Sequence, residues 1–423
     1  MAALRRALVA GAIAAGLVGD APARAAVLHV PAEHPTASQA LAVAAPGDTV
    51  LLSPGIYPEN LSLPSGVTLR GAGPPEAVVL DAGGLGPGVV CGMGVAGTRV
   101  ESITVRQGLG GPAGGGGVRV TGGSLALADV RFESCVAAFG AAVSCAGNAQ
   151  VTWNGGSATG GQASFGGALF ADGGSLALDH VTLSGNQGTK GGALYAQDTS
   201  PLSLVSCTIQ DNVSVGDGGA LYLVRTGTSI SDCGIRGNRA GGNGGGLAAE
   251  PGTQVVCGYS VLFANEGLAG GGLYAICDGP GGGACTLVQL THVDLVRNRG
   301  GGSGAAGIDG SARLEATASV VAFNEGGIAC LDPRAAIDLR CTLLHGNGPA
   351  SGFGCSASMT DTTTADPRLC GVATGNLERC ADSPALTSAC GPPFLGALGA
   401  GCATCGVTAS TPLTWGSLKA RYR

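Results

Sequence analysis

One motif recurs along the chain with a period of about 26 residues, and a fixed period of this size is typical of solenoids. This repeat limits the possible folds more than any other feature. The motif is Gly-Gly-Ala-Leu or a variant of it, and its apolar member falls at Val118, Val143, Leu169, Leu194, Leu221, Leu247 and Leu273. An asparagine recurs in a second register, at Asn186, Asn212, Asn238, Asn265, Asn298, Asn324 and Asn347.

Apolar and polar residues alternate within each repeat, as they do in a strand with one buried face. In the repeat that begins at Leu176, the alternation is interrupted at Asp179-His180, breaks at Ser184-Gly185-Asn186 and resumes at Leu194. Three short strands and three corners per repeat predict a parallel β-helix of about ten coils, each coil ~4.8 Å above the last.

The repeated asparagine is interpreted as a structural ladder. Its amide can bond to the amide of the next coil, and asparagine also tolerates the left-handed backbone conformation of a tight corner. A polar stripe that binds a ligand is the alternative.

Both ends of the stack carry features that are typical of caps. Pro35 to Ala45 is the best helix candidate, with Thr36 as its N-cap. Six cysteines crowd the C-terminal part: Cys355, Cys370, Cys380, Cys390, Cys402 and Cys405. We expect an N-terminal cap and first coils at 26–82, β-helix repeats at 83–350, a Cys-rich cap at 351–410 and a tail at 411–423. The basic, aromatic tail is a sorting tag or a frayed terminus.

The N-terminus has the pattern of a secretory signal peptide, residues 1–25. Arg5 and Arg6 precede an apolar run from Ala7 to Gly19, and Ala23-Arg24-Ala25 provides a cleavage site. The run is too short for a bilayer, so we expect export and no transmembrane span.

The even number of cysteines, 16, favours disulfides in an exported chain. Cys277 and Cys285 flank a loop that a bridge could close. Cys402 and Cys405 have a zinc-like spacing, but a second pair of ligands is missing, so we expect no metal.

Three segments resemble known protein families. The first comprises Ala44-Ala45-Pro46-Gly47-Asp48-Thr49-Val50, Pro54-Gly55-x-Tyr57-x-Glu59-Asn60 and Leu69-Arg70-Gly71, and it resembles the N-terminal cap and first coil of the pectin-lyase-like, right-handed parallel β-helix family. The repeat from Gly185-Asn186 to Gly191-Gly192-Ala193-Leu194-Tyr195 is similar to repeats of polymorphic outer-membrane proteins. Ala365 to Cys370 resembles the end of bacterial secreted proteins of this fold. These resemblances imply the fold but leave the function open, because the fold hosts lyases, hydrolases and adhesins.

Charge and motif content argue against several function classes. Charged residues make up 12% of the chain and the net charge is −6, so we expect no nucleic-acid partner. Acids occur singly, which does not favour a calcium-dependent lyase, and no cofactor motif occurs.

Two groups of residues are weak candidates for acid–base chemistry. One corner column contains Asp129, His180, Ser206, Asp232, Ser260 and His292. Its Asp and His residues alternate ~9–10 Å apart, too far for a hydrogen bond, so a solvated corner is the simpler interpretation. Asp211 and Asp217, which flank a glycine-rich loop, form the second group.

The residue after each repeated leucine should point outward. This column is Arg119, Ser144, Phe170, Tyr195, Tyr222, Ala248 and Tyr274. Its four aromatic residues, Phe170, Tyr195, Tyr222 and Tyr274, are the candidate ligand-binding residues, because sugar rings pack on aromatic faces. Packing of rings between coils is the alternative.

Together these patterns predict a monomeric, exported protein at the surface or in the surroundings of a bacterium. Its expected role is adhesive or glycan-contacting and non-catalytic, with a polysaccharide as partner and no cofactor. A polysaccharide-degrading lyase or glycoside hydrolase is the alternative, and a structural matrix component is the third possibility.

Overall fold

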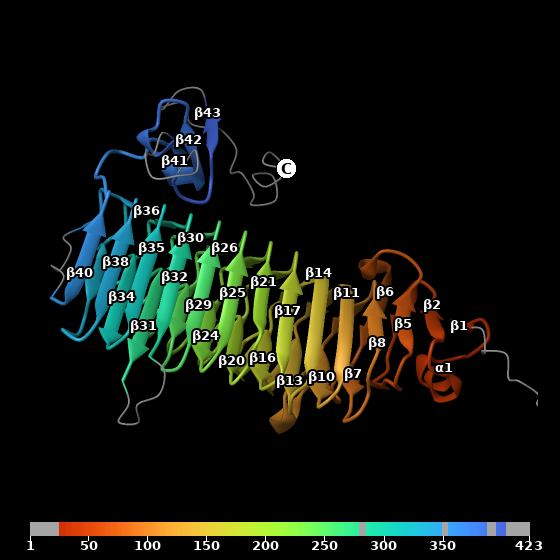
Figure 1. Cartoon of the computed structure of the whole chain (residues 1–423). Helices are drawn as coiled ribbons and strands as arrows, with labels where there is room; N and C mark the ends of the chain where they lie inside the picture. Colours follow the sequence, from red (N-terminus) through yellow and green to blue (C-terminus); the bar gives the residue numbers. More distant parts are fainter. Residues whose placement is uncertain (1–24, 279–284, 349–353, 387–394, 403–423) are drawn as a thin grey trace, which may run out of the picture.

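The strands of this chain stack in parallel along one axis and form a β-helix of about 14 turns (Figure 1). The computed structural model describes residues 25–278, 285–348, 354–386 and 395–402. Residues 1–24 of the expected signal peptide, Cys390, Cys405 and the tail at 411–423 lie outside these ranges. The all-β solenoid is confirmed, but the expected number of about ten coils was too low. The expected number included only the turns that carry Gly-Gly-Ala-Leu. It left out turns near the N-terminus, where four strands of the first ladder precede Val118.

The first ladder runs the full length of the molecule, and every pair of neighbouring strands in it is parallel. Its strands are β1 (Val27–Val30), β2 (Thr49–Leu52), β5 (Thr68–Gly71), β8 (Thr98–Glu101), β11 (Ser124–Glu133), β14 (Gln150–Thr159), β17 (Ser175–Asp179), β21 (Leu202–Val205), β25 (Gly227–Ser231), β29 (Gln254–Gly258), β32 (Leu287–Thr291), β35 (Arg313–Thr317), β38 (Ala336–Arg340) and β40 (Ser356–Thr360).

The second ladder follows the first after a corner that is two residues long in most turns. The long strands β11 and β14 belong to both ladders. The other members are β3 (Gly55–Tyr57), β6 (Val78–Asp81), β9 (Thr104–Arg106), β18 (Thr182–Ser184), β22 (Thr208–Gln210), β26 (Gly234–Arg236), β30 (Val261–Phe263), β33 (Asp294–Val296), β36 (Val320–Ala322) and β39 (Leu343–His345).

The third ladder contains the repeated leucines. It consists of β4 (Leu61–Ser62), β7 (Val89–Cys91), β10 (Val118–Thr121), β13 (Val143–Ala146), β16 (Leu169–Asp172), β20 (Leu194–Gln197), β24 (Leu221–Val224), β28 (Leu247–Ala249), β31 (Leu273–Cys277), β34 (Ala306–Gly310) and β37 (Ile328–Cys330). Between the second and third ladders, five turns add a short ladder, formed by β12 (Val136–Phe139), β15 (Gln162–Phe165), β19 (Gln187–Gly188), β23 (Val213–Ser214) and β27 (Arg239–Ala240).

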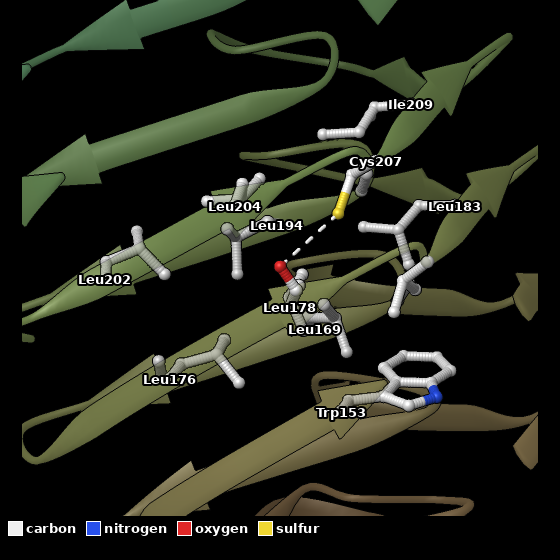
Figure 2. Close-up of a cluster of buried hydrophobic side chains, with 14 of the residues drawn as sticks. Trp153, Leu169, Leu176, Leu178, Leu183, Leu194, Leu202, Leu204, Cys207 and Ile209 are labelled. Carbon is white, nitrogen blue, oxygen red and sulfur yellow. Dashed lines mark hydrogen bonds between the residues drawn. The ribbon is translucent and has the colours of Figure 1, made fainter. Parts of the chain in front are cut away.

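The core is a continuous column of side chains from the inward positions of the ladders. Figure 2 shows leucines of successive turns, such as Leu176 and Leu202, one above the other. Trp153, among the largest fully buried side chains, packs edge-on against Phe132 with ring centroids 5.2 Å apart. Burial of each such side chain stabilises the stack by about 1.5–3 kcal/mol.

The asparagine column forms the expected structural ladder. In the middle of it, Asn212 donates from Nδ2 to Oδ1 of Asn238 at 2.9 Å, and its backbone N–H donates to the same oxygen at 3.0 Å. The expected left-handed conformation belongs to the preceding residue instead, for example Asp211 at φ +56° and Gly237 at φ +59°. The asparagine therefore binds the chain above, while its neighbour turns the corner.

A second left-handed column marks the corner between the first and second ladders. Asp129, His180, Ser206, Asp232 and His292 occupy it, each with a φ between +49° and +57°. The member on the turn between Asp232 and His292 is Tyr259, at φ +47°, so assigning Ser260 to this column was wrong by one residue. The register shows this, because Ser231 pairs with Gly258 and Gly234 with Val261, which places Tyr259 opposite Asp232.

The N-terminal end is closed by α1 (Ala37–Val43). Thr36 is its N-cap, and its side chain accepts a hydrogen bond from the Gln39 backbone N–H at 3.2 Å. Ala40 and Leu41 are buried on the inner side of the helix. The remaining helical segments are single 3-10 turns: η1 (Pro75–Ala77), η2 (Gly111–Ala113), η3 (Val372–Thr374) and η4 (Pro384–Leu386).

The Cys-rich C-terminal segment folds into a three-stranded sheet, β41 (Leu369–Gly371), β42 (Asn376–Cys380) and β43 (Ala400–Cys402). This sheet lies beside the last turns, against the outer face of the second ladder (Figure 1). Leu377 and Leu398 pack there on Val261 and Val296, which point outward from β30 and β33. Arg379 of β42 makes a fully buried ion pair with Asp294 of β33.

The cysteines divide into two groups. Disulfides join Cys277 to Cys285, as expected, and also Cys330 to Cys355 and Cys370 to Cys402. Six cysteines of the described residues are instead buried thiols, which departs from the pairing that the even count favoured: Cys91, Cys135, Cys145, Cys207, Cys233 and Cys257. Most of these thiols occupy core positions of the ladders, where a small apolar side chain fits.

Candidate ligand-binding pocket

The predicted aromatic column lies on the outer side of the third ladder. Phe170, Tyr195 and Tyr222 are direct neighbours on β16, β20 and β24. The rings of Phe170 and Tyr195 stack with centroids 5.5 Å apart, and those of Tyr195 and Tyr222 with centroids 5.2 Å apart. Tyr274 lies two turns beyond Tyr222, on β31, with Ala248 between them.

A second column of rings, which the sequence analysis did not identify, faces the first from the short ladder. Phe139 and Phe165 are the last residues of β12 and β15, and their rings stack with centroids 5.5 Å apart. Each is followed by a glycine in the left-handed region, Gly140 or Gly166. A Cβ at Gly166 would collide with the carbonyl oxygen of Leu169, so this sharp turn requires glycine.

Each ring of the short ladder packs against a ring of the third ladder that belongs to the next turn. Phe139 contacts Phe170 with centroids 4.9 Å apart, and Phe165 contacts Tyr195 edge-on at 5.3 Å. One turn further, Lys190 takes the place of the phenylalanine, and its Nζ lies 4.4 Å from the centroid of the Tyr222 ring. The sequence thus changes from a ring pair to a cation–ring pair at a defined turn.

These rings enclose a pocket of about 360 Å³, which we call the aromatic pocket. Phe139, Phe165, Phe170 and Tyr195 supply its rings, and η2 bounds it with Pro112 and Ala113. The volume falls within the range of small-ligand sites, roughly 300–1,000 Å³.

Polar groups of the aromatic pocket form a short chain of hydrogen bonds. The Tyr195 hydroxyl donates to Gln197 Oε1 at 3.0 Å, and Gln197 Nε2 donates to Asp172 Oδ1 at 2.9 Å. Asp172 and Gln197 are register partners on β16 and β20, which holds the carboxylate and the amide side by side. The pocket therefore combines apolar ring faces with one fixed carboxylate.

The tyrosine hydroxyls of the column are held in their neutral form. Burial raises the pKa of Tyr195 and of Tyr222, and the nearby Glu250 raises both further. Burial also raises the pKa of Tyr274, whose hydroxyl donates to Asp309 Oδ2 at 2.8 Å. The hydroxyls of Tyr195 and Tyr274 act as hydrogen-bond donors.

Of the four predicted ligand-binding residues, Phe170 and Tyr195 line the aromatic pocket, while Tyr222 and Tyr274 lie outside it. Tyr222 and Tyr274 are 4% and 5% exposed. The Tyr222 hydroxyl accepts a hydrogen bond from Lys190 Nζ at 2.7 Å. Both rings are buried between neighbouring turns, as is most of Phe170, which is 8% exposed, whereas Tyr195 is half-buried.

The groups considered for acid–base chemistry lie outside the aromatic pocket. The His180 ring nitrogen Nδ1 is 2.6 Å from Asp179 Oδ1 at an exposed corner, and His292 is buried with its ring stacked on Tyr259. Asp217 Oδ1 accepts a hydrogen bond from the backbone N–H of Asn243, which makes it a loop-stabilising group.

No protein-family model and no curated protein matches the sequence. Among solved structures, the chain is similar to the A-module of a mannuronan C-5 epimerase of Azotobacter vinelandii, with 14% identity, 75% of this chain and 86% of that chain covered, and a TM-score of 0.34. It is also similar to a surface adhesin of Streptococcus pneumoniae, with 12% identity, coverages of 74% and 83%, and a TM-score of 0.40. A PL6 family alginate lyase has 12% identity, coverages of 88% and 58%, and a TM-score of 0.38. At these identities the likeness concerns the fold alone.

Proposed function

We propose that this chain is an extracellular, non-catalytic β-helix protein that holds a glycan in its aromatic pocket. The observation that carries the proposal is the pocket itself, which four aromatic rings line together with a carboxylate and an amide. A sugar presents an apolar face for the rings and hydroxyl groups for the polar side chains, and pockets for small ligands combine these two kinds of surface.

The carboxylate content of the pocket supports binding over hydrolysis. Glycoside hydrolases use a pair of carboxylates on opposite sides of the scissile bond. Asp172 is the one carboxylate among the described residues that line the aromatic pocket. We therefore propose an adhesive or glycan-contacting role ahead of a polysaccharide-degrading lyase or glycoside hydrolase, and also ahead of a purely structural role.

Several features support a location outside the cytoplasm. Three described disulfides are typical of an oxidising compartment. Residues 1–25 have the pattern of a cleaved export signal, and the asparagine and Gly-Gly-Ala-Leu repeat is similar to that of polymorphic outer-membrane proteins. No helix among the described residues is long and apolar enough to cross a membrane. We propose a bacterial surface or extracellular protein.

The proposal is tested by titrating the purified protein with a panel of neutral, acidic and basic oligosaccharides while released fragments are assayed. We expect binding without fragments. Tyr195→Ala should weaken it by roughly two- to tenfold, because a stacked ring contributes ~0.5–1.5 kcal/mol beyond its buried area.

Tyr259→Ala is the matched control, because this exposed tyrosine stacks on His292 at a distant corner. Gln197→Ala keeps all four rings and separates the polar from the apolar contribution. Fragment release by the wild type, or equal binding by wild type and Tyr195→Ala, would contradict the proposal.

A further inference from the structure

The aromatic pocket presents negative electrostatic potential from two sources. Aromatic faces carry the negative end of the ring quadrupole and attract cations within ~6 Å of the ring centroid. The carboxylate of Asp172 adds a full negative charge beside these faces. Its Oδ1 is held by Gln197, and its Oδ2 accepts no hydrogen bond from any described residue, so one oxygen remains for a ligand.

Neighbouring charges reinforce this potential. Burial raises the pKa of the Tyr195 phenol, Arg225 lowers it, and the carboxylates of Asp172, Glu250 and Asp198 raise it further. Arg225 is itself bound by Asp198, with Nε to Oδ1 at 2.7 Å and Nη2 to Oδ2 at 2.6 Å. The guanidinium of Arg225 is therefore already neutralised by a carboxylate.

The described residues that line the pocket include no basic side chain. Lys190, one turn beyond the phenylalanine column, is occupied by the Tyr222 hydroxyl and ring. Arg119 on β10 is a basic side chain of the preceding turn, where it is the register partner of Ser144. Within the lining itself, an acidic sugar would face Asp172, whereas a protonated amine would find ring faces and a carboxylate oxygen together.

We infer that the aromatic pocket selects a positively charged sugar, so that the glycan bound by this protein contains amino sugars with free amines. This inference rests on the proposed glycan-binding function and specifies its ligand class. The ammonium group would lie against Phe139 or Phe170, the rings at the end of the two stacks, and donate to Asp172, while the sugar packs on the rest of the pocket lining.

The test compares three oligosaccharides of equal length by isothermal titration calorimetry: the glucosamine hexamer, the N-acetylglucosamine hexamer and the neutral glucose hexamer cellohexaose. At about pH 6 most free carboxylates remain ionised. We expect the glucosamine hexamer to bind about tenfold more tightly than the other two, which corresponds to ~1.4 kcal/mol. Asp172→Asn should reduce this preference to about twofold or less.

Asp179→Asn is the matched control, because it removes the same charge from a solvent-exposed side chain at the end of β17, in the first ladder. Equal binding of the three hexamers, abolished by Tyr195→Ala, would overturn the cation preference and leave the proposed function intact. Binding of none of the sugars in the full panel would overturn both. A preference that Asp179→Asn lowers as much as Asp172→Asn does would show general attraction by an acidic protein and would also overturn the inference.

Discussion

Asp294 and Arg379 bring opposite charges into the dry space between the second ladder and the C-terminal sheet. Arg379 Nη2 lies 2.6 Å from Asp294 Oδ1 and Nη1 lies 3.1 Å from Oδ2, and neither side chain is exposed. Burial raises the pKa of Asp294, while the guanidinium acts in the opposite direction. The two residues are 85 positions apart, so the pair fixes the C-terminal sheet to one turn of the β-helix.

Asp294→Ala should therefore release the C-terminal sheet, because it leaves Arg379 buried without its counter-charge, at a cost of about 3–5 kcal/mol. The loss would appear as a lower urea midpoint and as faster proteolysis near residues 369–402. Arg225→Ala, which breaks an exposed pair, should change the midpoint little.

A double variant, Asp294→Leu with Arg379→Met, tests the physical reason. Replacing a buried ion pair with apolar side chains of similar size is often neutral or stabilising. A double variant as unstable as Asp294→Ala would show that packing, rather than the unpaired charge, dominates at this position.

At the scale of elements, the asparagine ladder links seven successive turns through their side chains. Asn238 Oδ1 accepts from both the backbone N–H and Nδ2 of Asn212, and its own Nδ2 donates to Ile209 O and to Asn265 Oδ1. Each interior asparagine thus satisfies buried groups on both sides. The ladder adds a side-chain connection to the backbone ladders at every turn.

Asn238→Ala should lower the free energy of unfolding by about 2–6 kcal/mol, because two donors of Asn212 lose their acceptor and a buried unsatisfied group costs ~1–3 kcal/mol. Urea denaturation measures the change. The adjacent exposed Arg239→Ala is the control and should have little effect. A loss below about 1 kcal/mol in Asn238→Ala would mean that neighbouring side chains replace the amide.

The periodicity of the sequence was sufficient to predict the β-helix, the asparagine ladder and one half of the pocket. Leu194 points inward, so Tyr195 was placed on the outside by alternation alone. The other half was missed, because β12 and β15 contain no fully buried side chain that would mark an inward face. The sequence did contain a signal for these rings. Phe139 and Phe165 each stand directly before the first glycine of the repeated motif, and this glycine adopts the left-handed conformation.

The position of the C-terminal sheet was missed for a different reason. Outward residues of the second ladder change from Thr208 and Gln210 on β22 to Val261 and Phe263 on β30. This loss of alternation indicates a face that another segment covers. Alternation within one strand shows that a face is buried, but it does not identify the covering segment.

At the scale of the whole molecule, free thiols and disulfides occupy separate regions. The six buried thiols lie between Cys91 and Cys257, and the three described disulfides lie beyond them in the sequence. Burial raises the pKa of Cys91 and Cys135 to about 11 and that of Cys145 and Cys257 to about 12. These cysteines react slowly because the thiolate is the reactive form.

We therefore expect the folded protein to resist alkylation at these four cysteines at about pH 8, and the unfolded protein to take up label at each of them. Peptide mass spectrometry reads the result residue by residue. Labelling of Cys145 as fast as that of a free model thiol, in protein that is still folded, would show that the stack opens locally on the time scale of the experiment.

The pairing of rings between neighbouring turns means that the length of the pocket is set in whole steps. Each turn adds ~4.8 Å to the stack, and it has one side-chain position directly before its left-handed glycine. Phe139 and Phe165 fill two of these places with rings, and Lys190 fills the next with a charge that closes the series. Duplication of one repeat that carries such a ring would extend the groove by one step without disturbing the turns on either side. The size of the accepted ligand could therefore evolve by copying a single short stretch of the gene rather than by redesigning a fold.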